Sequence, residues 1–202
     1  MTPQPYPATS PSSSSSSSAP ERRRPRAEAH QELLHTLFIE VFQTEQSADV
    51  HSRREADRLD SEPPAKALRA VADHAKAALV EITALAETRG LSDTRAGMAV
   101  GSFFSMVRNL LADRLIDRER SYRGTLLGMR HGLDVVRSVR FVAEAAGDDA
   151  LVASLDRWLL VRAPLVDSVA AELAWFARNP ESALEGGKGS LRRNIATLLR
   201  IG

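Results

Sequence analysis

The stretch from residue 27 to residue 60 reads AEAHQELLHTLFIEVFQTEQSADVHSRREADRLD and contains neither glycine nor proline. Its apolar residues return every three or four positions, which is the period of one face of an α-helix. That face consists of Leu34, Phe38, Val41, Glu45, Ala48, Ser52, Glu55 and Leu59. We therefore expect a long amphipathic helix whose core side is interrupted by carboxylates.

A second helix follows directly. The sequence Ser61-Glu62-Pro63-Pro64 breaks the first pattern and supplies helix-start signals, because proline is favoured in the first turn. The apolar stripe then continues to about residue 89, and Gly90 is a natural stop.

Residues 92–146 contain no proline, yet one helix of that length would reach roughly 80 Å. We expect a break near Gly101 to Asn109, so that about 92–109 forms a crossover and about 110–146 a third helix. Gly147-Asp148 then ends the third helix and caps a fourth, which runs to Arg178 with Pro164 inside it.

Charge also interrupts the core faces of the later helices. In the third helix the face is Leu111, Leu115, Glu119, Tyr122, Leu126, Met129, Leu133 and Val136. In the fourth, Arg162 stands between Trp158 and Val166. Unpaired charge in a core is expensive, so these side chains should pair with each other, bind a metal or reach water.

Four long helices with short first and third connections and a long second one predict an all-α, up-down-down-up four-helix bundle. Over about residues 27–178 this layout resembles the ferritin-like superfamily. The resemblance implies a two-iron centre with Glu on helices one and three and Glu-x-x-His on helices two and four. Here Glu-x-x-His occurs only at Glu32 to His35 in the first helix, His74 has Val71 three residues before it, and the fourth helix lacks histidine. The standard centre is therefore not expected.

A non-standard site is the alternative. Counted from the bundle end near residue 60, the charged positions of the four helices fall at similar depths, and His51 and Glu55 share one helix face. Two interpretations stay open. One is a salt-bridge network completed by Arg123 or Arg162. The other is a divalent metal (iron, manganese or zinc) bound by Glu45, His51, Glu55, His74 and Glu119.

Three glycines, Gly124, Gly128 and Gly132, recur at four-residue spacing in the third helix. Each costs about 1 kcal/mol relative to alanine, so we expect another backbone to approach closely. The approaching element is either the crossover or a second subunit in a homodimer.

The ends of the chain differ from the middle. Residues 1–26 are rich in serine and proline, as in a solvated tail or a basic docking arm. Residues 179–189 read as a flexible linker, and residues 190–202 as a short amphipathic segment. Its Leu191, Ile195, Leu198 and Leu199 could pack on the bundle or on a protein partner. Gly189 to Arg193 resembles the core of an encapsulin cargo-loading peptide.

Composition limits the class of protein. The chain has 202 residues and no cysteine, which excludes disulfides and thiolate chemistry. A formal charge of +1 argues against broad capture of nucleic acid. No apolar stretch is long enough to span a membrane, and there is no signal-peptide core, so we expect a cytoplasmic location. No catalytic motif was found.

These observations favour a non-enzymatic ferritin-like bundle with a structural or interaction role. The alternatives are a metal-binding or oxidoreductase-like bundle, and a cargo or adaptor protein acting through its C-terminal segment.

Overall fold

The computed structural model describes residues 26–91 and 117–186, and every regular element in these ranges is a helix. The helices are α1 (Arg26–Leu59), α2 (Pro63–Thr88), α5 (Arg118–Ala146), α6 (Asp149–Ala171), α7 (Leu173–Arg178) and α8 (Pro180–Ala183). The all-α class predicted from the sequence is confirmed for this part of the chain.

Local sequence accounts for where the long helices begin and end. Asp60, just after α1, has a positive φ of 52°, and Pro63 and Pro64 open α2 two residues after Ser61. Gly147 ends α5 in the left-handed conformation, with φ 74°, which glycine adopts without steric cost. The Asp148 side chain then accepts a hydrogen bond from the Leu151 amide at 2.9 Å and so caps α6.

Two predictions about the end of the bundle need correction. We expected one helix to continue to Arg178, but the chain is interrupted at Glu172, between α6 and α7. Pro164 lies within α6 without ending it. The predicted linker also contains a helix, α8, which starts with proline at its first position, where the missing amide is not needed.

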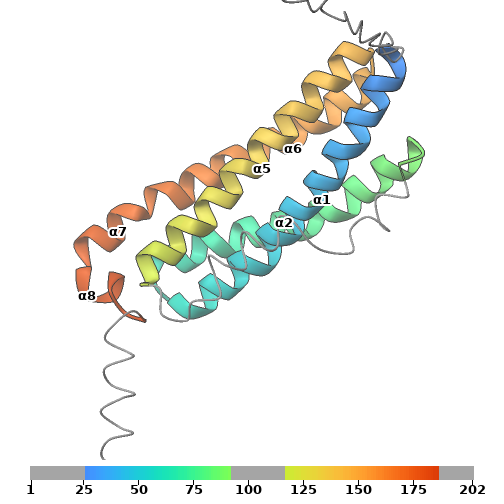
Figure 1. Ribbon diagram of the computed structural model, residues 1–202. Helices are drawn as coiled ribbons and strands as arrows, with labels where there is room; N and C mark the ends of the chain where they lie inside the picture. The colour runs from blue at the N-terminus through green and yellow to red at the C-terminus, as the bar shows by residue number, and fades with distance from the viewer. Residues whose placement is uncertain (1–25, 92–116, 187–202) are drawn as a thin grey trace, which may run out of the picture.

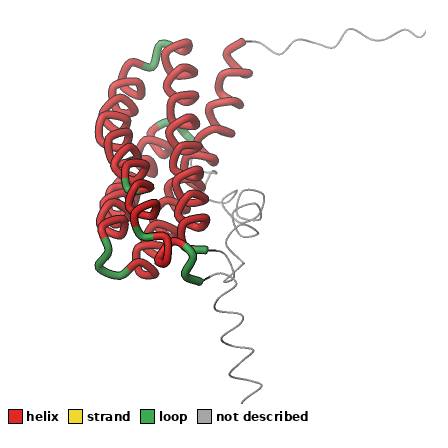
Figure 2. The backbone as a smooth tube through the Cα atoms, turned by 90° about the vertical axis from the view of Figure 1, so that its left-hand side faces the viewer, coloured by secondary structure: helices red, strands yellow, loops and turns green. Residues whose placement is uncertain are grey.

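The four long helices lie side by side with their axes nearly aligned (Figures 1 and 2). α1 packs against α2 and α5, and α6 packs against the same two helices, so α1 and α6 are diagonal to one another. Neighbouring helices run antiparallel. Between α1 and α5, for example, Glu40 contacts His131 while Glu55 contacts Ser121.

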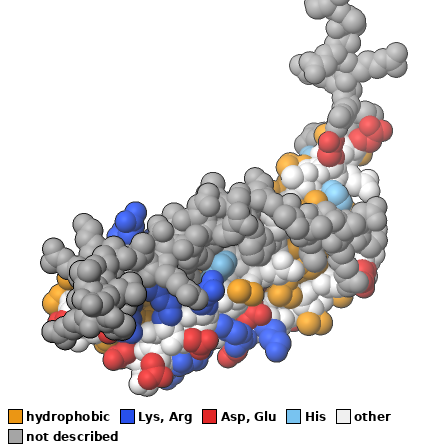
Figure 3. Space-filling view, turned by 60° about the horizontal axis from the view of Figure 1, so that its bottom comes forward, with side chains coloured by type: hydrophobic (Ala, Val, Ile, Leu, Met, Phe, Trp, Pro, Cys, Tyr) orange, Lys and Arg blue, Asp and Glu red, His pale blue; other side chains and the backbone are white. Residues whose placement is uncertain are grey.

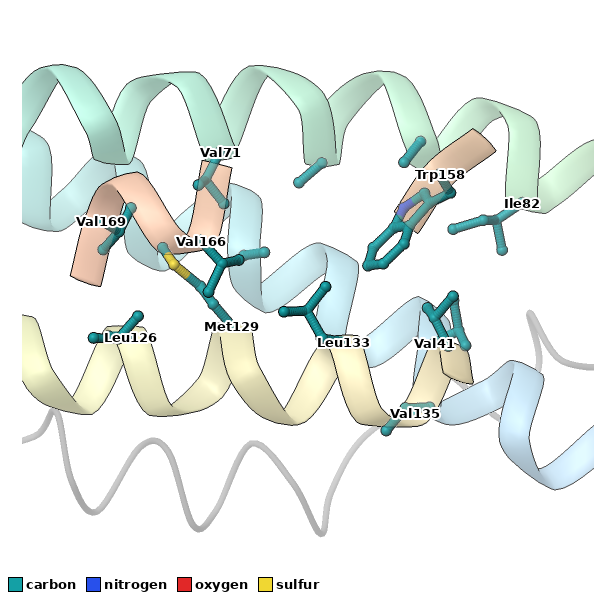
Figure 4. Packing of buried hydrophobic residues seen from close by; sticks show 14 of the residues in the cluster. Val41, Val71, Ile82, Leu126, Met129, Leu133, Val135, Trp158, Val166 and Val169 are labelled. Carbon is teal, nitrogen blue, oxygen red and sulfur yellow. The ribbon is translucent and has the colours of Figure 1, made fainter. Parts of the chain in front are cut away.

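The core runs along the centre of this bundle. Figure 4 shows its middle, where Val71 of α2, Val166 of α6 and Leu126, Met129 and Leu133 of α5 meet. Trp158 of α6 points into the same cluster, between α2 and α5. Burying such side chains is worth about 1.5–3 kcal/mol each, so the amphipathic pattern of the helices stabilises the bundle.

Several predicted features fall outside the described residues: the serine-rich tail, the crossover over about 92–109, Leu111 and Leu115, and the amphipathic segment 190–202. Within the described residues, none of the helices is long and apolar enough to span a membrane. On the face drawn in Figure 3, acidic and basic side chains are intermixed over the described surface.

Candidate functional site: a buried ionic network

An arginine and a glutamate form an ion pair across the diagonal of the bundle. Arg162 of α6 is 2% exposed and Glu45 of α1 is 1% exposed. The Arg162 Nη2 donates to the Glu45 Oε2 at 2.5 Å. Because α1 and α6 lie diagonally across the bundle, this pair links two helices that do not pack directly side by side.

Two aromatic rings complete the surroundings of the guanidinium. The Arg162 Nε donates to the Nδ1 of His74, on α2, at 3.0 Å. The Arg162 Cζ also lies 4.9 Å from the centre of the Trp158 ring, within the range of a cation–π contact. The rings of His74 and Trp158 meet edge to face, with centroids 5.9 Å apart. One arginine thus contacts side chains on three helices.

Burial changes the proton affinity of all three charged or titratable groups. It raises the pKa of Glu45 to about 7, although the neighbouring Arg162 charge acts in the opposite direction. It lowers the pKa of His74 to about 4, and the Arg162 charge lowers it further. Burial also lowers the pKa of Arg162, which Glu45 partly restores. The network therefore favours a neutral histidine beside a permanently charged arginine.

A second polar group lies nearer the end of α1. The Ser121 Oγ donates to the Glu55 Oε2 at 2.7 Å. The Arg58 Nη1 donates to the Ser121 Oγ at 2.9 Å and to the same Glu55 Oε2 at 3.1 Å. Glu55 is 2% exposed. Beside it, the Tyr122 hydroxyl donates to the Val169 carbonyl at 2.9 Å. Burial, with the charges of Glu172 and Glu55, raises the pKa of Tyr122.

The sequence pattern placed Glu119 on the core face of α5, and this prediction is wrong. Its side chain is 32% exposed and pairs with Arg123 one turn later, which is 57% exposed. This pair lies at the surface because Glu119 occupies the first turn of α5, where the core face is only beginning. Arg123 therefore has no part in the buried network.

The five predicted metal ligands do not share one set of partners. Glu45 and His74 share Arg162, Glu55 pairs with Ser121 and Arg58, and Glu119 pairs with Arg123. His51 is half-buried, and burial followed by the Arg54 charge lowers its pKa. Among residues 26–91 and 117–186, no three histidine, aspartate or glutamate side chains are grouped so that they could hold a metal ion. These five residues do not form one site.

The sequence identified part of the network and missed the rest. Glu45 and Arg162 followed from their core-face positions, and pairing between them was one of the stated alternatives. The roles of Trp158, Ser121 and Arg58 were missed. Arg58 carried a signal, since it lies three residues after Glu55 and so one turn along the helix.

The glycines of α5 also have an unexpected neighbour. Gly132 is buried, and a Cβ added there would lie 3.4 Å from the Thr44 Cβ. At Gly132 the approaching element is therefore α1 of the same chain, while the predicted crossover lies outside the described residues and the predicted second subunit stays a prediction. A Cβ added at Gly128 would meet no atom of the described residues within 4 Å. His131, between these glycines, lies 2.9 Å from Glu40.

No protein-family model, curated protein or solved structure matches this chain.

Proposed function

We propose that this chain is a non-enzymatic, ferritin-like helical bundle with a structural or interaction role, in which the buried ionic network fixes how the long helices face one another. The observation that carries the proposal is that Arg162, the central charge of the network, is paired inside the bundle. Arg162 donates to Glu45 and to His74, and both acceptors come from other helices. A site built for substrate would leave such groups directed at a cavity.

The ferritin-like arrangement is part of the same proposal. α5 is antiparallel to α1, as the Glu40–His131 and Glu55–Ser121 contacts require, and α2 is antiparallel to α1 through Arg53–Asp73 and Asp60–Arg69. α2 and α5 then run in the same direction. This supports the predicted up-down-down-up bundle, whose crossover of about 92–109 lies outside the described residues.

The perturbed pKa values are compatible with this role. Strongly shifted groups often mark catalytic sites, but structural ion-pair networks shift pKa values too. In this bundle burial is the first cause of the shifts at Glu45, His74 and Arg162. A buried polar network of this kind can specify one arrangement of helices over others, even where it adds little net stability.

Metal analysis tests the proposal against the metal-binding alternative. The full-length protein is purified without chelator, its metal content is measured, and its melting temperature is compared with and without a chelator. We expect no stoichiometric metal and an unchanged melting temperature. Stoichiometric iron, manganese or zinc that raises the melting temperature, and that is lost in both His51→Ala and His74→Ala, would overturn the proposal.

A further inference from the structure

The hydrogen bond between Arg162 and His74 sets the protonation state of the imidazole. An arginine Nε can only donate, so the His74 Nδ1, 3.0 Å away, must present its lone pair. A proton on that nitrogen would leave two donors facing each other, on two cations. The contact exists only while the Nδ1 of His74 is unprotonated.

We propose that Arg162 and His74 form an acid-sensitive latch between α6 and α2, which is closed when His74 is neutral and opens when its Nδ1 takes up a proton. The latch depends on the ionic network described above. It does not depend on the structural or interaction role proposed for the bundle, because it rests on the contact alone. It does exclude His74 as a metal ligand, since an Nδ1 that accepts leaves the ring proton on Nε2.

The groups around His74 determine what happens to its contact with Arg162 when the imidazole is protonated. From α6 it faces the Arg162 guanidinium and the Trp158 ring, and from α1 the Glu45 carboxylate shares the same arginine. The core face of α5 carries the apolar Met129 and Leu133 at this part of the bundle (Figure 4). Glu45 is the one carboxyl group among these contacts, and burial raises its pKa to about 7, so it carries little charge at the acid pH at which His74 takes up its proton.

Protonation has a mechanical consequence because of what else joins the two helices. A second contact joins α2 and α6 where α2 ends and α6 begins. There Arg89, the residue after α2, donates two hydrogen bonds to Asp148, the residue before α6, at 2.7 Å and 2.9 Å. Breaking the Arg162–His74 contact would leave the Arg89–Asp148 contact between α2 and α6 intact. We therefore expect α6 to loosen from α2 around Trp158 and Arg162 while the end held by Arg89 stays in place.

Trp158 can report the event directly. Protonated imidazole quenches a nearby indole more strongly than neutral imidazole does, and the two ring centroids are 5.9 Å apart. The chain has 2 tryptophans, so Trp175→Phe leaves Trp158 as the single emitter. Its emission is recorded from pH 7 downwards, with helix content followed by circular dichroism in the same samples.

The expected result is a fall in emission with a midpoint well below the ordinary histidine value of 6.5, near 4, before helix content is lost. In the same background, His74→Gln should lose the step, because the glutamine amide oxygen accepts from Arg162 at every pH. If the step persists in His74→Gln, or coincides with loss of helix in both proteins, the latch is refuted.

A second measurement covers the case in which His74→Gln does not fold. Nuclear magnetic resonance of the unsubstituted protein gives the His74 ring shifts and the Arg162 Nε–H resonance as functions of pH. The latch requires the arginine resonance to change together with His74 protonation. Titration of His74 at its ordinary pKa, with the arginine signal unaffected, would contradict it.

Discussion

Among single residues, Arg162 is the buried charge that joins Glu45 and His74. It is 2% exposed and donates to Glu45 and His74. Arg162→Met keeps much of the volume but leaves a buried carboxylate without its partner. We expect a loss of about 3–5 kcal/mol in the free energy of unfolding, measured by denaturant titration.

Arg157→Met is the matched control, because Arg157 is exposed on the same helix and donates only to Ser154 in its own turn. It should change stability by less than about 0.5 kcal/mol. Equal effects of the two substitutions would show that Arg162 is not a buried partner.

Glu45 and His74 should give stability opposite dependences on pH. The raised pKa of Glu45, about 7 against 4.5, means that the folded protein binds the extra proton, so this contribution is lost as pH rises through 7. The lowered pKa of His74, about 4 against 6.5, makes its contribution disappear as pH falls from 6.5 to 4. Between 4.5 and 6.5 the two trends oppose each other.

Glu45→Gln removes the contribution of Glu45, so the remaining pH dependence of stability in this range should come from His74. We expect its stability to fall more steeply than that of the unsubstituted protein on acidification from pH 6.5 to 4.5, as measured by denaturant titrations across that range. Parallel curves for the two proteins would mean that Glu45 does not titrate there.

A substitution at Glu119 tests whether this side chain lies at the surface of α5 or in the core. Since its ion pair with Arg123 is at the surface, Glu119→Ala should cost no more than about 1 kcal/mol. Thermal or chemical unfolding measures this directly. A loss of about 3 kcal/mol or more would place Glu119 in the core after all.

At the scale of the elements, the glycines of α5 can be separated by substitution. Gly128→Ala should raise the free energy of unfolding by about 0.5–1 kcal/mol, because the helix gains propensity and a Cβ there meets no atom of the described residues within 4 Å. Gly132→Leu should lower it, since a Cβ at that position already lies 3.4 Å from the Thr44 Cβ. The reverse order of stabilities in unfolding titrations would contradict the packing of α5 on α1.

The helix boundaries show what a sequence can and cannot predict at this scale. The ends at Leu59 and Ala146 were predictable, because prolines and a left-handed glycine mark them. The interruption at Glu172 was not, because neither glycine nor proline lies beside it. Helical periodicity continues across such a break without a change in pattern.

At the scale of the whole molecule, periodicity indicates which face a residue occupies but not which residues meet across the bundle. It placed Glu45 and Arg162 in the core and allowed their pairing. It could not distinguish the contact of His74 with Arg162 from a shared metal, because both need only similar depth in adjacent helices. Its prediction for Glu119 was wrong, because the first turn of α5 is still partly open to solvent.

If the buried network acts as one structural unit, Glu45 and Arg162 depend on each other, and a double-mutant cycle measures that dependence. Denaturant titrations compare Glu45→Leu, Arg162→Met and the double variant with the unsubstituted protein. We predict that each single change costs about 3–5 kcal/mol while the double variant loses far less than their sum, because removing both charges strands neither. Losses that add within about 0.5 kcal/mol would contradict the account, since they would mean that the two side chains do not depend on each other.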